Sequence, residues 1–431
     1  MTTVCVVGLG YIGLPTAAMM ASRGFEVIGY DVNEAAVASI NAGKAHFHEP
    51  DLQMLLSAAL NTGRLKAQNE PAEADYFIIA VPTPFRDGKK PDMSHVEKAC
   101  DAIAPYLQPG STVILESTSP VGSTEMVAGR LAAARPDLTL PDYKESGDAQ
   151  IAVAHCPERI LPGNMLRELV ANDRIIGGMT ETCSLRARAL YESFVTGHIY
   201  VTDCRTAEFV KLIENASRDV NIAFANELSV ICDRIGVDVW HAVELANKHP
   251  RVSILQPGTG VGGHCIAVDP WFIVDSAPEE ARLIRMAREV NDRKPEYIFH
   301  RILDLADRFK SPVVSCFGVT YKADVGDLRE SPSLKIVMKL LQHGGVRVLV
   351  CDPLIKALPP EFSGCPDVSL VDADTARRES DIVAFLVAHK QFKRLEFNRF
   401  LHKVVVDATG LMSKPNGLVD GAFASPRKEP W

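Results

Sequence analysis

The sequence predicts an α/β protein with two doubly wound lobes joined by a long central helix. Short β-branched runs alternate with helical stretches over roughly the first 200 residues and again in the last third. Between them, the stretch from Thr206 to Arg234 keeps a helical period without Gly or Pro. Residues 24–31 and 345–352 both read as a glycine turn, a strand and an aspartate. We therefore expect two Rossmann-like lobes.

Strands that alternate with helices predict a parallel sheet covered on both faces in the first lobe. The expected strands are Val4–Val7, Glu26–Tyr30, Tyr76–Val81, Thr112–Leu115, Ile151–Ala154 and Asp173–Ile176. The expected helices are Leu14–Arg23 and Val96–Leu107. In the last third, the expected strands are Val313–Val319, Val346–Val350, Asp381–Val387 and Lys403–Val406, with a helix at Ser333–Leu341.

The middle of the chain predicts a helical connector. A helix from Thr206 to Arg234 would run about 40 Å at 1.5 Å per residue. Further helices are expected at Val239–Ala246 and Ala281–Arg293. We therefore divide the sequence into an N-terminal lobe (1–203), a central helical region (204–300) and a C-terminal lobe (301–431).

Composition excludes several classes of protein. The chain has 431 residues and a net charge of −8, with 54 acidic side chains against 46 Lys and Arg, which argues against a nucleic-acid partner. No apolar run approaches the roughly 20 residues of a membrane helix. Ten cysteines without a Cys-x-x-Cys pair are typical of reduced, cytoplasmic thiols. We interpret His46-Phe47-His48-Glu49 as a polar loop and expect no metal site.

The clearest motif is Gly8-Leu9-Gly10-Tyr11-Ile12-Gly13, which follows a strand and opens a helix. Asp31 lies 18 residues beyond Gly13, at the end of the next expected strand. This combination is typical of a dinucleotide site, where the glycines admit the pyrophosphate and the carboxylate binds the adenosine ribose. A carboxylate there repels a 2′-phosphate, so the sequence favours NAD over NADP.

Two threonines follow later strands of the first lobe. Thr83 lies in Val81-Pro82-Thr83-Pro84 and Thr118 in Glu116-Ser117-Thr118. Ligands of doubly wound sheets bind at the carboxyl ends of the strands, so both threonines are candidates to face the nicotinamide half of the cofactor. The alternative is that each only caps the end of its strand.

A second glycine-rich segment, Gly258 to Gly263, leads to Cys265 and then Asp269. If the loop feeds a helix, these two side chains share one helical face and the thiol lies at the helix N-terminus, where thiolate is favoured. The other nine cysteines mostly lie in apolar runs. The alternative interpretation is a structural glycine turn with a buried cysteine.

NAD together with a nucleophilic cysteine predicts a specific reaction. An alcohol is oxidised to an aldehyde, the thiolate holds it as a thiohemiacetal, a second oxidation gives a thioester, and water releases an acid. Lys211 and Asn215 lie four residues apart on the central helix, so both can face one pocket and oppose an oxyanion. An outward-facing Lys211 remains the alternative.

Long sequence blocks resemble the UDP-glucose/GDP-mannose dehydrogenase family over nearly the whole chain. They are Gly8–Pro15, Cys156–Arg159, Glu214-Asn215 with Arg218–Glu227, His249–Arg251, Leu255–Gly258 and Gly262–Trp271. The resemblance implies that residues 1–203 bind NAD, 204–300 carry the cysteine loop and a dimerisation surface, and 301–431 bind a UDP-sugar. It also implies a cytoplasmic enzyme of polysaccharide biosynthesis that forms a homodimer.

The resemblance assigns catalytic roles to residues that match the family. Cys265 is implied as the nucleophile, with Lys211 and Asn215 as the oxyanion pair. Asp269 is implied to interact with this group and with the catalytic water.

The same resemblance implies contacts with water, cofactor and substrate. Thr118 and Glu158 are implied to order and activate the water that hydrolyses the thioester, and Arg251 to be delivered across a dimer interface. The implied cofactor contacts are Gly8, Gly10, Tyr11, Ile12, Gly13, Asp31, Thr83, Thr118 and Arg329. The implied substrate contacts are Glu158, Arg159, Ile160, Leu161, Lys211, Asn215, Arg251, Gly262 and Lys322.

The loop Glu158-Arg159-Ile160-Leu161-Pro162-Gly163 departs from the UDP-glucose members of the family, which usually carry Phe-Leu after the Pro-Glu pair. It resembles the acetamido-sugar branch. This implies four-electron oxidation of UDP-N-acetyl-D-mannosamine at C6 to UDP-N-acetyl-D-mannosaminuronate. The same chemistry on UDP-N-acetyl-D-glucosamine is the alternative. Two other hypotheses are a silent NAD-binding scaffold and a two-electron hydroxyacid dehydrogenase.

Overall fold

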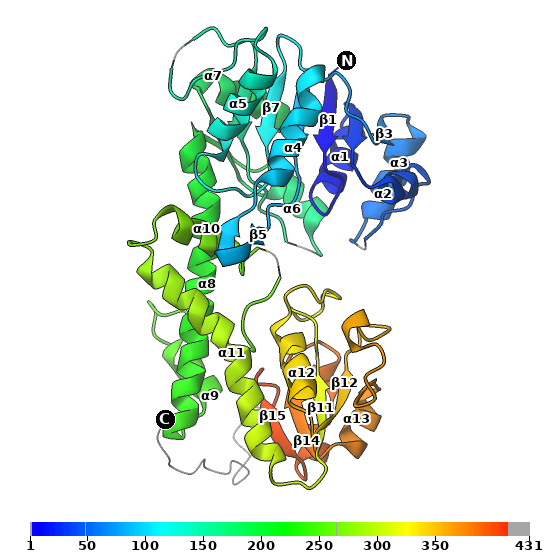
Figure 1. The fold of residues 1–431 in the computed structure, drawn as a ribbon, viewed down its shortest axis with the longest axis vertical. Helices are drawn as coiled ribbons and strands as arrows, with labels where there is room; N and C mark the ends of the chain where they lie inside the picture. Colours follow the sequence, from blue (N-terminus) through cyan, green and yellow to red (C-terminus); the bar gives the residue numbers. More distant parts are fainter. Residues whose placement is uncertain (1, 48, 146, 162, 264, 413–431) are drawn as a thin grey trace. The chain divides into compact units, whose positions relative to one another are not determined.

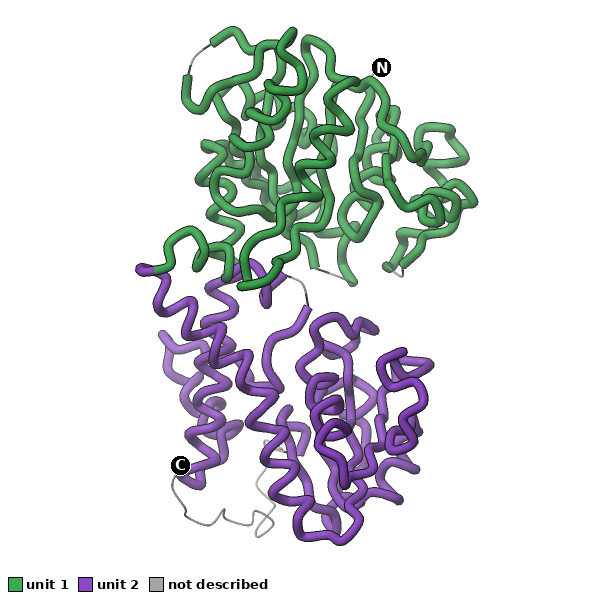
Figure 2. Tube along the Cα trace, viewed as in Figure 1, with its two compact units in different colours: residues 1–214, 271–278 green, residues 215–270, 279–431 purple. Residues whose placement is uncertain are grey.

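The computed structural model describes residues 2–47, 49–145, 147–161, 163–263 and 265–412. The chain forms two compact units: unit 1 comprises residues 1–214 and 271–278, and unit 2 comprises residues 215–270 and 279–431 (Figure 2). Each unit holds one largely parallel sheet with helices packed on it (Figure 1). The predicted α/β class is confirmed, whereas the division into segments 1–203, 204–300 and 301–431 remains a prediction.

The sheet of unit 1 has eight strands in the order β10-β9-β8-β7-β4-β1-β2-β3. Their bounds are β1 Thr3–Val7, β2 Glu26–Tyr30, β3 Leu65–Gln68, β4 Tyr76–Ile79, β7 Thr112–Leu115, β8 Ala152–His155, β9 Arg174–Gly178 and β10 Ile199–Asp203. All neighbouring pairs are parallel except β8 and β9, where Ala154 faces Gly178 in antiparallel register. The sequence did not predict this pair. Only a loop and the short helix α6 (Met165–Ala171) connect the two strands, and an antiparallel neighbour needs no full crossover.

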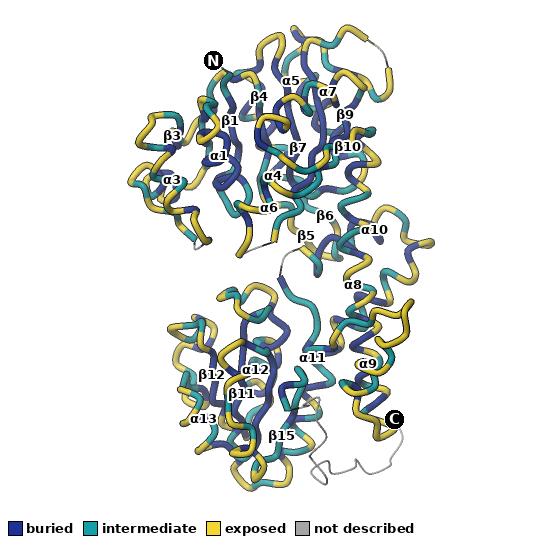
Figure 3. Tube along the Cα trace, turned by 180° about the vertical axis from the view of Figure 1, so that it is seen from behind, coloured by how far each residue is buried: buried dark blue, intermediate teal, exposed yellow. Residues whose placement is uncertain are grey.

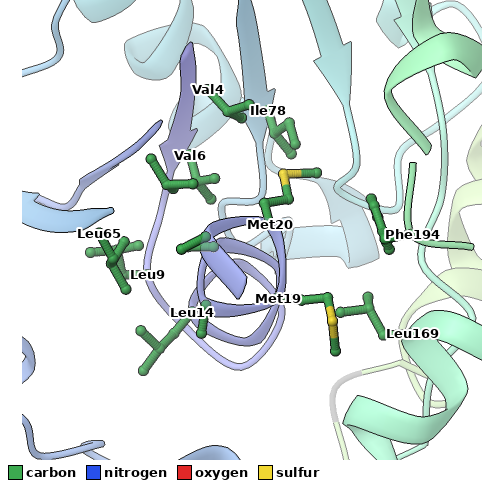
Figure 4. Packing of buried hydrophobic residues seen from close by; sticks show 14 of the residues in the cluster. Val4, Val6, Leu9, Leu14, Met19, Met20, Leu65, Ile78, Leu169 and Phe194 are labelled. Carbon is green, nitrogen blue, oxygen red and sulfur yellow. The ribbon is translucent and has the colours of Figure 1, made fainter. Parts of the chain in front are cut away.

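Helices cover both faces of this sheet because β1 is apolar on both sides. Val4 and Val6 enter one core with α1, whereas Cys5 and Val7 enter the opposite core. Figure 4 shows α1 end-on, with Met20 beside Ile78 and Met19 beside Leu169. The remaining elements of this part are α1 Gly13–Ser22, α2 Glu34–Asn41, α3 Leu52–Asn61, β5 Phe85–Arg86, β6 Lys90–Pro91, α4 Ser94–Ile103, α5 Ser123–Ala134 and α7 Glu181–Tyr191.

The predicted long helix is present as α8 (Cys204–Ile235), followed by α9 (Val239–Ala246) and α10 (Asp269–Ser276). The next helix, α11, runs from Arg282 to Ala306, so its predicted end at Arg293 is wrong. The helix continues through Pro295, which costs one backbone hydrogen bond. Its next turns bury Ile298 and Ile302 in the core of unit 2, and this packing carries the helix past the proline.

The sheet of unit 2 has five parallel strands in the order β13-β12-β11-β14-β15. Their bounds are β11 Val313–Phe317, β12 Arg347–Cys351, β13 Val368–Leu370, β14 Ile382–Phe385 and β15 Val404–Asp407. Helices α11 and α12 (Pro332–His343) contribute to the core on one face, and α13 (Ala373–Glu379) to that on the other. In Figure 3 the central strands of each unit are mostly buried, whereas the edge strand β10 and many connecting loops are more exposed.

Within the described ranges, no helix is both long and apolar enough to cross a membrane.

Candidate active site

The glycine loop after β1 has two glycines that the fold requires and one that it does not. Gly8 has a φ of +91°, and a Cβ there would lie 2.8 Å from the Ala80 carbonyl oxygen. A Cβ on Gly13 would lie 1.8 Å from the Gly8 carbonyl oxygen. Among the described residues, apart from its two neighbours in the chain, Gly10 has no atom within 4 Å of the position that a Cβ would take. The loop is therefore open at its middle glycine, where a pyrophosphate approaches the backbone in dinucleotide sites.

The sequence provides no side-chain cap at the N-terminus of α1. The capping residue Ile12 makes no side-chain hydrogen bond to the helix, and the first turn carries no acidic residue. The free N–H groups of a helix start favour an anion such as a phosphate. Beside it, the ring of Tyr11 stacks on Phe47 with the ring centroids 4.2 Å apart.

Asp31 follows β2 and reaches the glycine loop. One carboxylate oxygen accepts the Leu9 N–H at 2.8 Å, and the other accepts the Asn33 N–H at 2.8 Å. The residue is half-buried, and the next side chain, Val32, is 80% exposed. A carboxylate held beside an open glycine loop fits the ribose of NAD.

Thr83 and Thr118 come together at the carboxyl ends of β4 and β7. The Thr83 hydroxyl donates a hydrogen bond to the Thr118 carbonyl at 2.6 Å, and both residues are half-buried. Their proposed contacts with the nicotinamide half remain a prediction.

Glu158 follows β8 and is buried. Its Oε1 accepts the Arg159 N–H at 2.8 Å, and its Oε2 lies 2.8 Å from the Arg174 guanidinium. Arg174 also lies 3.8 Å from Glu116, and the Tyr191 hydroxyl donates to Glu116 at 3.0 Å. No role for Glu116, Arg174 or Tyr191 was predicted from the sequence. The one signal that could have pointed to this cluster is an arginine at the start of β9, directly before Ile175 and Ile176.

The loop after Glu158 is tied to unit 1 itself. The Arg159 guanidinium pairs with Glu214 on α8 at 2.6 Å and donates to the Asp173 carbonyl at 3.1 Å. Ile160 packs against the core, whereas Leu161 is exposed. Pro162 lies outside the described residues. The structure thus gives Arg159 partners within the chain, and its contact with a substrate remains a prediction.

Lys211 lies on α8 and is half-buried. It forms no hydrogen bond or ion pair with the part of the chain that the structure describes, so its ammonium is not neutralised there. Nearby His155 is fully buried, and burial lowers its pKa to about 3, with the Lys211 charge acting in the same direction. A neutral His155 adds no competing charge beside Lys211.

Cys265 is the only exposed cysteine among those that the structure describes. Its carbonyl accepts the N–H groups of Val268 and Asp269, both at 2.9 Å, so one turn separates it from the first residue of α10. The predicted shared helical face is therefore only approximate, because the helix begins at Asp269. Burial raises the pKa of six other thiols to about 12, which leaves them protonated: Cys5, Cys100, Cys156, Cys204, Cys316 and Cys351.

Asn215 and Asp269 form a hydrogen-bonded pair in unit 2. The Asn215 amide donates to the Asp269 carboxylate at 2.5 Å, and Asp269 is buried. Since the Asp269 N–H also binds the Cys265 carbonyl, three of the predicted catalytic residues lie together. Their catalytic roles remain predictions.

The glycines before Cys265 are required by close packing within unit 2. A Cβ on Gly262 would lie 2.6 Å from the Glu330 carbonyl oxygen, and Gly260 has a φ of +128°. The Gly263 N–H donates to the Arg329 carbonyl at 3.1 Å. His264 lies outside the described residues. The loop that precedes the thiol is therefore held by the segment that carries Arg329.

The other predicted ligand contacts of unit 2 lie on its loops. Arg329 is exposed and pairs with Asp327 at 2.6 Å. Lys322 is half-buried, and its carbonyl accepts the Thr320 hydroxyl at 3.0 Å. Arg251 is exposed. Contacts of these side chains with cofactor or substrate remain predictions.

A buried polar network joins α8 to α11. Asp219 pairs with Arg288 at 2.6 Å and accepts the Asn291 amide at 2.8 Å. Asn226 donates to Asn291 at 2.9 Å and accepts the Gly258 N–H at 2.8 Å. This explains the Arg218–Glu227 block structurally, since its residues anchor the start of the glycine-rich loop.

Among the described residues, no group of three or more His, Cys, Asp or Glu side chains is placed to hold a metal ion.

Comparison with known proteins matches nearly the whole chain to one family. The NAD binding domain of the UDP-glucose/GDP-mannose dehydrogenase family matches residues 2–195, the central domain residues 205–293, and the UDP binding domain residues 315–414. The chain belongs to the UDP-glucose/GDP-mannose dehydrogenase family. It is therefore an NAD-binding nucleotide-sugar dehydrogenase, in agreement with the open glycine loop and the placement of Asp31.

Individual relatives carry two kinds of name. An NDP-N-acetyl-D-galactosaminuronic acid dehydrogenase of Ralstonia nicotianae is 59% identical, over 95% of this chain and 96% of its own. A UDP-N-acetyl-D-mannosamine dehydrogenase of Campylobacter jejuni is 52% identical, over 92% of this chain and 97% of its own. Among solved structures, UDP-D-ManNAc dehydrogenase of Pyrococcus horikoshii has a TM-score of 0.85 at 36% identity, covering 96% of each chain.

Proposed function

We propose that the protein oxidises the C6 alcohol of UDP-N-acetyl-D-mannosamine to a carboxylate, with two NAD consumed per sugar. The observation that carries this proposal is Cys265, which is exposed and lies beside the Asn215–Asp269 pair. A two-electron dehydrogenase has no need of a nucleophilic thiol, whereas a double oxidation needs a group that holds the aldehyde between its two stages.

The chemistry follows from the thiol. NAD, when bound at the Gly8–Gly13 loop, supplies the hydride acceptor. Loss of the hydroxyl proton and of a hydride from C6 first turns the alcohol into an aldehyde. The Cys265 thiolate then attacks the aldehyde carbon, so that a carbon–sulfur bond forms and the carbonyl oxygen becomes an alkoxide. Removal of a hydride from the same carbon leaves a thioester. Attack by water breaks the carbon–sulfur bond, releases the carboxylate and returns the thiolate.

Charged and polar side chains are proposed to stabilise these stages. The Lys211 ammonium and the Asn215 amide oppose the negative charge that develops on the sugar oxygen, and one such donor is typically worth a factor of about 10² to 10³ in turnover. Asp269 orients the Asn215 amide through their hydrogen bond. Thr118 orders the water, and Glu158 accepts its proton as it attacks the thioester.

Positive side chains of unit 2 are proposed to bind the substrate pyrophosphate. Lys322 and Arg251 are the residues we assign to this role, and Arg329 to the cofactor. The homodimer, the delivery of Arg251 across its interface and the cytoplasmic location remain predictions.

A second candidate substrate has the galacto configuration, because the Ralstonia nicotianae relative is 59% identical to this chain. N-acetyl-D-galactosamine and N-acetyl-D-mannosamine differ at C2 and C4 but share the C6 alcohol. The proposed chemistry is therefore the same for both, and only the residues that contact the ring decide between them.

A panel of nucleotide sugars with NAD tests the substrate assignment. We expect kcat/KM for UDP-N-acetyl-D-mannosamine to exceed that for UDP-N-acetyl-D-galactosamine, UDP-N-acetyl-D-glucosamine and UDP-glucose by about tenfold or more, since one acetamido contact is worth ~1–3 kcal/mol. A preference for the galactosamine substrate would move the assignment to the second candidate. A preference for UDP-glucose would refute both.

A further inference from the structure

Glu158 belongs to a closed cluster of ionisable side chains in unit 1. Glu116 follows β7, Arg174 begins β9 and Tyr191 ends α7. The four residues are almost completely buried, with exposures of 2% for Glu116, 7% for Glu158, 3% for Arg174 and 0% for Tyr191. Water therefore does not screen the charges of this cluster as it would on the surface.

One cation in this cluster, Arg174, lies near both carboxyl groups. The Arg174 guanidinium lies 2.8 Å from Glu158 Oε2 and 3.8 Å from Glu116 Oε1. It also lies over the ring of Tyr191, 4.8 Å from the centroid, and the Tyr191 hydroxyl donates to Glu116 Oε1 at 3.0 Å. The other carboxyl oxygen of Glu116 is buried without a hydrogen-bond partner among the described residues.

In this geometry the two carboxyl groups have different electrostatic surroundings. Burial and the negative charge of Glu158 raise the pKa of Glu116 to about 8, against the opposing effects of Arg174 and Tyr191. Cys156 also faces the cluster, with its sulfur 3.9 Å from Arg174, but burial raises the pKa of its thiol to about 12 and it stays neutral. At neutral pH, Glu116 therefore holds a proton, and the Arg174 guanidinium lies closer to Glu158 than to Glu116.

We propose that Glu116 is a positioning residue for thioester hydrolysis: it shares the Arg174 guanidinium with Glu158 and thereby controls how basic the Glu158 carboxylate is. The inference rests on the proposed role of Glu158 as the base. When Glu116 is neutral, Arg174 is left to Glu158, which is then a weaker base. When Glu116 ionises, its negative charge increases the proton affinity of Glu158. Hydrolysis should therefore accelerate as the pH rises through the ionisation of Glu116.

The test isolates hydrolysis from the preceding oxidations. The C6 aldehyde of UDP-N-acetyl-D-mannosamine is mixed with the protein and NAD, and the decay of the thioester on Cys265 is followed by intact-protein mass spectrometry. For the wild type we expect the decay rate to rise about threefold or more between pH 7 and 9, because rate follows the basicity of the general base. Glu116→Gln mimics the neutral carboxyl group. Its thioester decay rate should therefore match that of the wild type at pH 7 within about twofold, but should not increase between pH 7 and 9.

A second variant should shift the pH dependence of the hydrolysis rate and not abolish it. The hydrogen bond from Tyr191 lowers the pKa of Glu116, so Tyr191→Phe should move the rise in hydrolysis rate to higher pH. If Glu116→Gln does not fold, Tyr191→Phe still tests the role of Glu116. Glu181→Gln is the matched control, since it removes a carboxylate from the exposed start of α7 and should leave the profile unchanged.

The possible outcomes distinguish the proposed role of Glu116 from the proposed role of Glu158 as the base. A rise that persists in Glu116→Gln, or a Tyr191→Phe profile identical to that of the wild type, overturns the role of Glu116. Hydrolysis at the wild-type rate by Glu158→Gln refutes the proposed base itself, whatever Glu116 does. A rise lost in both Glu116→Gln and the Glu181→Gln control would also overturn the inference, because the effect would then not be specific to the cluster.

Discussion

The first strands of the two sheets end in the same backbone geometry, but the aspartates that reach these two ends have different partners. Gly8 after β1 has a φ of +91°, and Gly318 after β11 has a φ of +87°. The Gly8 N–H donates to the Tyr30 carbonyl and the Gly318 N–H to the Cys351 carbonyl, both at 2.8 Å. In both units, therefore, the residue before the aspartate (Tyr30 or Cys351) accepts a hydrogen bond from the glycine that follows the first strand.

The aspartates show where the two ends differ. Asp31 accepts the Leu9 N–H and Asp352 the Val319 N–H, both at 2.8 Å. Asp352, however, is buried and lies 3.2 Å from the ring of the fully buried His389. Asp31 is half-buried and carries no such partner in the described residues. The same pattern thus gives a half-buried carboxylate beside the glycine loop in one unit and a buried carboxylate bound to a histidine in the other.

The two aspartates should differ most in their effect on stability. Asp352→Ala leaves the N–H groups of Val319, Thr320 and Leu354 and the His389 ring with one partner fewer in a buried site. We expect the free energy of unfolding to fall by about 3 kcal/mol. Asp31→Ala should lower it by less than about 1 kcal/mol, because its surroundings remain accessible to water. Urea denaturation of both variants measures the difference, and equal losses would contradict the comparison.

Cofactor preference should respond only to the first aspartate. Asp31→Ala removes the carboxylate that repels a 2′-phosphate, so the ratio of kcat/KM for NAD over NADP should fall by about 10-fold to 100-fold, or ~1.4–2.8 kcal/mol. The ratio is measured with the same sugar nucleotide at saturation. Equal use of NAD and NADP by the wild type would show that Asp31 does not select the cofactor.

Acidification should reveal the structural role of Asp352. Burial alone would raise its pKa, but hydrogen bonds from His389 and from the N–H groups of Val319 and Leu354 outweigh it, so the pKa lies below its ordinary value. A depressed carboxyl pKa adds stability above the ordinary value, and this stability is lost as the pH falls through the folded-state pKa. The stability gap between wild type and Asp352→Asn should therefore shrink as the pH falls from 7 to 3. A gap independent of pH would be inconsistent with this account.

Substitution of Gly10 should have the smallest effect on the stability of the fold. Gly10→Ala should leave the Tm within about 1 °C, because the added Cβ meets no atom within 4 Å. The same methyl group would obstruct a pyrophosphate, so the KM for NAD should rise about tenfold. Gly13→Ala is the contrasting variant, since its Cβ would lie 1.8 Å from a backbone oxygen. A Gly10→Ala protein with unchanged KM would place the pyrophosphate elsewhere.

Local patterns explain what the sequence predicts correctly. The strand–glycine–helix motif, the position of Asp31 after β2 and the long helix α8 depend on residues close in the chain. The Glu116–Arg174 contact could not be predicted, because 58 residues separate the partners in the sequence and only the sheet order brings them together. The continuation of α11 past Pro295 likewise depends on packing in the core of unit 2.

Counting the NADH produced per uronate formed from UDP-N-acetyl-D-mannosamine tests most directly whether Cys265 links two oxidations. We expect two NADH per uronate for the wild type. Cys265→Ala should lose at least about 10³-fold in uronate formation, or ~4 kcal/mol, because the aldehyde is no longer held for the second oxidation. Cys365→Ala, at a half-buried thiol of the same unit, is the matched control and should behave as the wild type. One NADH per sugar, or near-normal uronate formation by Cys265→Ala, would contradict the account.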